Sequence, residues 1–276
     1  MNSEREFEYT ETDFLRVKNL VYNFAGIDLN DSKKNLVYNR LAKRIRFLQQ
    51  DSFDEYLNYV EAQGEAEFIH LINAITTNLT FFFRENHHFE FLAETVIPEL
   101  LQKNQSTKKI RVWSAGCSTG EEPYSIAIVL KEVVPPGWDA KVIATDLDTN
   151  VVNTASAGVY KVDRLKGVSE ARKKNWFMRG KGSNDGYVKV KPDLQSIIEF
   201  GQINLMNEWP IKDQIDVIFC RNVVIYFDKE TQSKLFNRYA DLLREKGYLF
   251  VGHSESLYKV CDRFELLGKT IYQKKD

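Results

Sequence analysis

The chain has 276 residues, a length that favours two domains. Hydrophobic residues make up 43% and charged residues 28%, which is enough apolar material for a folded core and excludes wholesale disorder. The 38 basic and 39 acidic residues leave a formal net charge of −1, whereas a protein that binds nucleic acid over its whole surface would be more basic.

The first quarter of the chain has the apolar spacing of helices. Hydrophobic residues recur three and four positions apart, and polar residues suited to helix N-caps precede several of these segments. The pattern predicts helices over residues 12–25, 32–49, 51–60 and 66–77. We therefore expect an all-helical N-terminal domain over residues 1–75.

Beyond residue 76, short apolar segments alternate with amphipathic ones. The expected strands are residues 110–116, 141–146, 197–200, 215–220 and 247–252, and the expected helices between them are residues 123–133, 150–156 and 229–244. This alternation predicts an α/β domain over residues 76–276 with a doubly wound, mostly parallel sheet. Residues 264–272 are typical of a final antiparallel hairpin at the sheet edge.

One segment interrupts the alternation. Residues 179–186 are rich in glycine and turn-forming residues, and residues 187–191 alternate as a strand does. We expect a small β insertion at about residues 175–195. An ordinary surface hairpin and an edge strand that accepts a peptide are both compatible with this pattern.

The loop after the first predicted strand suggests a ligand without phosphate. Gly116 and Gly120 allow a tight turn and a close approach of the ligand, but the loop lacks both the P-loop and the G-x-G-x-x-G patterns. Glu121 and Glu122 at the start of the next helix would repel a phosphate and suit a cationic ligand. Two acids at a helix start also stabilise the helix alone, so that interpretation stays open.

An acid ends the second predicted strand. In this architecture such an acid commonly binds the hydroxyl groups of a ribose, although a solvated aspartate is also common there. A nucleoside with a positive tail would suit both Asp146 and Glu122. S-adenosylmethionine, with a sulfonium and an amino-acid tail, is the candidate that fits this description.

Two further segments place polar residues near the predicted crevice. Arg221 and Asn222 follow the fourth strand, at the carboxyl edge where ligands bind in such sheets, and Tyr226 follows one turn later. Core packing is the alternative interpretation for Tyr226. Before the sheet, the otherwise apolar run 76–85 contains three polar side chains, those of Asn78, Thr80 and Arg84.

Taken together, these segments resemble the chemotaxis receptor methyltransferase (CheR) family. The motifs occur in the family's order and cover nearly the whole chain. They are Thr77–Glu85 with His87–Phe89, Trp113–Ala127, Ala144–Asp148, Phe177–Gly180, Phe219–Asp228 and Gly252–Glu255.

The resemblance implies a class I S-adenosylmethionine-dependent methyltransferase. Its substrates would be glutamate side chains on cytoplasmic helices of methyl-accepting chemotaxis receptors, and Arg84 and Tyr226 would lie beside the methyl group. It also implies that the β insertion holds a receptor C-terminal peptide, as it does in some members. The cofactor contacts carried over are Asn78, Thr80, Arg84, Glu122, Asp146, Asn204, Leu205, Arg221 and Asn222.

The chemistry of such a reaction needs little acid–base catalysis. A glutamate carboxylate has a reference pKa of about 4.3 and is already ionised at neutral pH, so no general base is required. The cysteines and histidines lack metal-ligand spacing, and we expect no metal. Opposite charges neutralise during transfer, so a partly dry pocket would help.

Residues 31–50 carry six basic side chains and one acid. A solvated helix face is the ordinary explanation for such a stripe. The resemblance favours docking of an acidic receptor helix bundle on Arg40, Lys43 and Arg46.

Two rival functions use the same features. A nucleic-acid methyltransferase would share the cofactor motif, but the net charge and the absence of a recognisable base-flipping loop argue against it. A cofactor-loaded adaptor would dock on receptors without catalysis.

The expected location follows from composition. Three widely spaced cysteines argue against a disulfide framework and suit a reducing cytoplasm. The chain contains no run of 18 apolar residues and no apolar signal core, so we expect no membrane insertion. We expect a cytoplasmic protein that is recruited to membrane receptor clusters.

Overall fold

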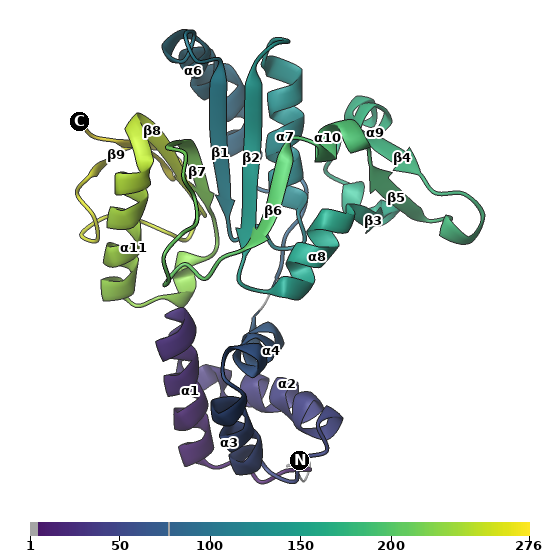
Figure 1. The fold of residues 1–276 in the computed structure, drawn as a ribbon, viewed down its shortest axis with the longest axis vertical. Helices are drawn as coiled ribbons and strands as arrows, with labels where there is room; N and C mark the ends of the chain where they lie inside the picture. The colour runs from purple at the N-terminus through teal and green to yellow at the C-terminus, as the bar shows by residue number, and fades with distance from the viewer. Residues whose placement is uncertain (1–4, 77) are drawn as a thin grey trace.

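The computed structural model describes residues 5–76 and 78–276. Helices α1 to α4 form a separate bundle at the N-terminal end of the molecule, and the carboxyl ends of β1 and β2 point toward it (Figure 1). The helices of the bundle are α1 Glu11–Ala25, α2 Lys34–Phe47, α3 Phe53–Gln63 and α4 Glu65–Ile75.

The bundle confirms the four predicted helices. Phe14, Val17 and Val21 of α1 are fully buried because they recur on one face, and they share a core with the apolar faces of α2 to α4. Helix α1 starts at Glu11, one residue before its expected start, because Thr10 and Asp13 form a capping box. The fourth helix was expected to reach Thr77, which lies outside the described residues.

The α/β part contains the remaining elements. Its helices are α5 His87–Phe91, α6 Ile97–Lys103, α7 Glu121–Val133, α8 Thr149–Ala157, α9 Glu170–Trp176, α10 Pro192–Gln195 and α11 Lys229–Leu242. Its strands are β1 Lys109–Ala115, β2 Asp139–Asp146, β3 Val159–Lys161, β4 Phe177–Arg179, β5 Tyr187–Val190, β6 Ile198–Gln202, β7 Ile215–Cys220, β8 Leu243–Val251, β9 Phe264–Gly268 and β10 Ile271–Lys274.

The main sheet has the expected doubly wound topology. Within the described chain its strand order is β6-β2-β1-β7-β8-β10-β9. Strands β6, β2, β1, β7 and β8 run parallel, and β10 and β9 add the predicted antiparallel hairpin at the edge.

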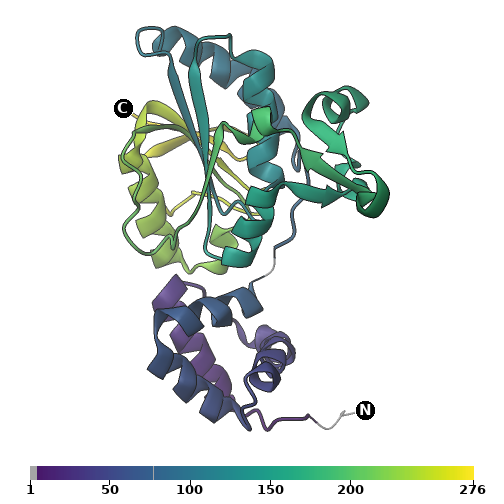
Figure 2. The same cartoon turned by 45° about the vertical axis from the view of Figure 1, so that its right-hand side comes forward.

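Alternating side chains of the central strands enter two different cores. Val112 of β1 and Val217 of β7 belong to the core beneath α7, whereas Trp113 and Ile218 belong to the core beneath α11. Helices α7 and α11 accordingly lie on opposite sides of the sheet (Figure 2). Both faces of the central strands are therefore buried, as in parallel sheets generally.

The β insertion is larger than the sequence pattern indicated. A second, antiparallel sheet of order β3-β5-β4 projects from the side of the molecule (Figure 1). Its strand β3 precedes the predicted insertion of residues 175–195, and its three residues were too few for alternation to be recognised. The segment from α5 to α6 was also not predicted as helical. No described helix is long and apolar enough to cross a membrane.

Candidate functional site

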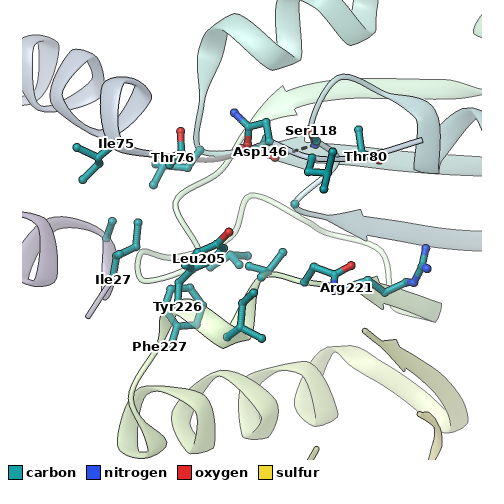
Figure 3. A pocket seen from close by; sticks show the side chains of 18 of the residues that line it. Ile27, Ile75, Thr76, Thr80, Ser118, Asp146, Leu205, Arg221, Tyr226 and Phe227 are labelled. Atoms are coloured by element: carbon teal, nitrogen blue, oxygen red, sulfur yellow. Dashed lines mark hydrogen bonds between the residues drawn. The ribbon is translucent and has the colours of Figure 1, made fainter. Parts of the chain in front are cut away.

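A cavity of about 460 Å³ opens at the carboxyl ends of the parallel strands. Strand β1 lies between β2 and β7, and the helices that follow β1 and β7 along the chain cover opposite faces, so a crevice forms at this point. Residues of the helical bundle and of the connection to the sheet close its other side. In Figure 3, Ser118 and Asp146 lie on one wall, and Ile27, Tyr226 and Phe227 lie on another.

The structure brings all the predicted cofactor and catalytic residues to this one cavity. They come from five separate segments between residues 78 and 226, so their meeting does not follow from proximity in the sequence. The residues are Asn78, Thr80, Arg84, Glu122, Asp146, Asn204, Leu205, Arg221, Asn222 and Tyr226.

Asp146 ends β2, and two backbone hydrogen bonds hold its carboxylate in place. Its two oxygens accept hydrogen bonds from the backbone N–H groups of Ser118 (2.8 Å) and Asp148 (3.0 Å). Burial nevertheless raises the pKa of Asp146 to about 6. The Ser118 hydroxyl beside it is buried and, within the described chain, lacks a hydrogen-bond partner. A polar ligand would supply one.

Gly116 shapes the floor of the cavity. Its φ of +101° is a conformation that side chains rarely adopt, and a Cβ atom there would collide with Val223. The glycine therefore lets the loop after β1 pack closely against the loop after β7.

A buried ion-pair network forms the end of the cavity near Arg221. Its guanidinium lies 3.0 Å from Glu122 Oε2 and 3.2 Å from Glu85 Oε2, and it donates to the backbone oxygen of Arg84. Ser114 donates to the other Glu122 oxygen at 2.7 Å. Burial raises the pKa of Glu122, although Arg221 and Ser114 oppose that shift.

Glu85 belongs to this network and was not predicted. Burial would raise the pKa of Glu85, but Arg221 and His253 outweigh burial and hold it below its ordinary value. Glu121, in contrast, was expected to attract a cationic ligand. Glu121 is not among the residues that line the cavity, and it binds Arg164 and Thr119, so that expectation was wrong for Glu121.

The loop after β7 depends on a second unpredicted acid. The Glu255 carboxylate accepts the backbone N–H groups of Gly252 (2.6 Å), Asn222 (2.9 Å) and Ile225 (3.2 Å). Asn222 has a φ of +60°, a strained conformation that these bonds help to hold. Glu255 ends one of the family motifs, which was the only sequence signal available for it.

Arg84 and Tyr226 both border the cavity but differ in how they are held. Arg84 donates to the backbone oxygen of Leu79 at 2.7 Å, and its guanidinium lies 5.8 Å from the centre of the Phe81 ring. Tyr226 is 36% exposed. Its phenol makes no hydrogen bond with the described residues, so it is available to a ligand.

Asn204 and Asn78 are each held by a hydrogen bond to another segment of the chain. The Asn204 amide donates to the backbone oxygen of Phe24 at 2.6 Å, and the Asn78 amide donates to Asp148 at 3.0 Å. Asn204 thus joins the loop after β6 to the end of α1. Leu205 and Thr80 are buried in the cavity wall.

The helical bundle contributes a wall that the sequence did not indicate. Ile27, Asp28, Asn30, Lys33 and Leu36 all line the cavity. Most of them lie in the short connection between α1 and α2, where no periodic pattern exists to assign a face.

The three predicted docking cations do not form a uniform face. Arg40 Nη1 donates to the backbone oxygens of Ile75 (2.7 Å) and Thr76 (2.6 Å), where α4 ends. Arg46 is exposed and pairs with Glu6. Lys43 is exposed, and the described residues include no ion-pair partner for it.

His87 and His88 act in packing and hydrogen bonding. His88 is fully buried, packs against Phe250 and approaches the Lys269 oxygen at 3.0 Å, and His87 approaches the same oxygen at 3.3 Å. The two imidazoles and Glu85 lie close enough to share a metal ion, but the Arg221 guanidinium beside Glu85 opposes a cation. That no metal is needed stays a prediction.

Comparison with known proteins gives a consistent result over the whole chain. Residues 12–76 match the family model of the CheR methyltransferase all-alpha domain, and residues 78–273 match that of the CheR methyltransferase SAM binding domain. The chain is 44% identical over 274 residues to chemotaxis protein methyltransferase 2 of Pseudomonas aeruginosa, covering 97% of this chain and 95% of that protein. It is 44% identical to the chemotaxis protein methyltransferase of Salmonella typhimurium (95% and 90% covered) and 42% identical to that of Escherichia coli (95% and 91%).

Proposed function

The chain belongs to the CheR methyltransferase family, and we propose that it methylates glutamate side chains on the cytoplasmic helices of methyl-accepting chemotaxis receptors. The methyl group would come from S-adenosylmethionine, and the products would be glutamyl methyl esters and S-adenosylhomocysteine, as part of sensory adaptation. The observation that carries the proposal is that all the cofactor-binding and catalytic residues that the resemblance implied line one cavity.

The cavity fits a nucleoside with a charged tail. Its volume lies within the roughly 300–1,000 Å³ of small-molecule sites. Asp146 offers a carboxylate to ribose hydroxyls, and the Ser118 hydroxyl, which has no partner among the described residues, lies beside it. Glu122 and Arg221 face the opposite end. When bound, S-adenosylmethionine supplies a methyl group made electrophilic by the positive sulfur.

The protein's own contribution is alignment and exclusion of water. Arg84 would either orient the incoming glutamate carboxylate or help to bind the cofactor. Tyr226 would either donate a hydrogen bond or shape the passage through which the carboxylate reaches the methyl group. Positioning of this kind is worth roughly 7–11 kcal/mol in well-aligned cases. Leu205, Ile203 and Val223 provide apolar lining that reduces the water content around the neutralising charges.

The assay for this function uses S-adenosylmethionine with a labelled methyl group. Base-labile methyl esters on the receptor would support the proposal. Label on nucleic acid would favour the nucleic-acid methyltransferase, and binding without transfer would favour the adaptor.

Substitution of the two catalytic candidates tests their roles. Arg84→Ala and Tyr226→Phe should each reduce kcat by about 10- to 100-fold, because each removes a hydrogen bond to a charged or polarised group. Receptor methylation rates measure the effect, with Tyr258→Phe as a control because Tyr258 is 77% exposed. A rate within twofold of wild type would remove the residue from the mechanism.

Asp146 should make cofactor affinity depend on pH. Its pKa of about 6 means that the ionised form, which accepts hydroxyl hydrogen bonds, is lost as the pH falls below 6. The Kd for S-adenosylhomocysteine should therefore be constant above pH 7 and rise toward tenfold per pH unit below about 6. Calorimetry on wild type and Asp146→Asn decides this: the variant should bind weakly with a flat profile, and an identical profile in both would exclude Asp146 as the cause.

We propose that residues 1–75 dock on the receptor and that residues 76–276 carry the chemistry. Since Arg40 also holds the end of α4, docking is better tested at the exposed Lys43 and Arg46. Lys43→Gln with Arg46→Gln should raise the KM for receptor several-fold at low salt and little at high salt. Lys246→Gln, on the distant strand β8, is the matched control; an unchanged salt dependence would argue against docking on α2.

The β insertion is proposed to bind the C-terminal peptide of a receptor. A second cavity there has the apolar residues Phe177 and Val188 beside Lys174 and Arg179, a combination that suits an apolar peptide with a terminal carboxylate. Lys173 and Glu170 also line it, as an ion pair. A receptor C-terminal pentapeptide should bind wild type and lose at least tenfold in affinity for Arg179→Gln. Equal binding of the amidated peptide would contradict recognition of the carboxylate. Binding of the receptor's C-terminal peptide to the β insertion would recruit a cytoplasmic enzyme to receptor clusters.

A further inference from the structure

The loop that carries Tyr226 is fastened to the helical bundle. Tyr22, near the end of α1, donates its hydroxyl hydrogen bond to Asp228 Oδ2 at 2.6 Å. The backbone N–H of Asp28 donates to the backbone oxygen of Tyr226 at 2.8 Å, and Ile27 forms an antiparallel bridge with Phe227. Tyr226 and the two residues that follow it are thus bonded to the bundle.

The α/β part holds the same loop from the other side. Glu255 fixes Asn222 and Ile225, and the Gln232 amide donates to the backbone oxygens of Val224 and Phe227 at 2.9 Å each. Packing adds little at the tip, because Ile225 is 48% exposed and Tyr226 is 36% exposed. Hydrogen bonds therefore decide where the phenol lies.

Asp228 links the bundle to the start of α11. One of its oxygens caps α11 by accepting the Thr231 N–H at 2.8 Å, and the other accepts from Tyr22. These two donors hold the pKa of Asp228 below its ordinary value, so the Tyr22 hydroxyl bonds to an anion at neutral pH. Bonds to an ionised acceptor are stronger than neutral ones.

We infer that Tyr22 is a positioning residue for methyl transfer, which acts by fixing the Asp228 end of the loop so that the Tyr226 phenol faces the cavity. The inference rests on the proposed role of Tyr226. It makes the bundle part of the active site as well as a docking domain.

A double-mutant cycle tests the inference. Tyr22→Phe removes only the hydroxyl from a residue that is 39% exposed, so it leaves no cavity. It should lower kcat about three- to tenfold and leave the KM for receptor and the Kd for S-adenosylhomocysteine unchanged. In the Tyr226→Phe background the same substitution should have no further effect, because the group that it positions is gone. Tyr59→Phe in α3 is the control.

Hydrogen exchange supplies a readout independent of activity. In Tyr22→Phe the backbone amides of Tyr226 and Phe227 should exchange faster, while the melting temperature stays within a degree or two of wild type.

Three outcomes would overturn the inference. They are a wild-type kcat in Tyr22→Phe, an equal loss in both backgrounds, or unchanged exchange of these amides. A wild-type kcat in Tyr226→Phe would instead overturn the proposed role of Tyr226, so the two failures are distinguishable.

Discussion

The site depends on the burial of one guanidinium. The side chain of Arg221 is 2% exposed and pairs with Glu122 at the start of α7 and with Glu85 after the connection between the two parts. Removing one partner of such a buried pair costs about 3–5 kcal/mol, because it leaves an uncompensated charge. The connection, the start of α7 and the end of β7 therefore have to meet in one arrangement, and the cavity forms where they meet.

The same arrangement accounts for the kind of ligand that the cavity accepts. Asp146 ends β2 and Glu122 lies in the first turn of α7, and the loops after β1 and β2 contain no phosphate-binding lysine. A nucleoside with an amino-acid tail suits this set, because Asp146 can accept from ribose hydroxyls and the tail, which carries both charges, meets the paired Glu122 and Arg221. Methyl transfer to an ionised carboxylate then needs alignment and a dry environment more than proton transfer.

Much of this could be predicted from the sequence, for identifiable reasons. Helices α1 to α4 and the parallel strands follow from hydrophobic periodicity, and Asp146 and Arg221 follow from their places at strand ends. What was missed depends on contacts between distant segments. The bond from Asn204 to Phe24 joins residues 180 positions apart, and the contacts of Glu255 involve only backbone groups. A basic stripe likewise cannot reveal that Arg40 holds the end of α4.

The central claim is that the crevice between the helical bundle and the sheet is a nucleoside site. A crystal structure with S-adenosylhomocysteine tests it most directly. The account predicts one nucleoside per chain, with ribose hydroxyls within hydrogen-bond distance of Asp146 and Ser118 and the tail toward Arg221. A ligand bound elsewhere, or density absent from this crevice at saturating concentration, would contradict it.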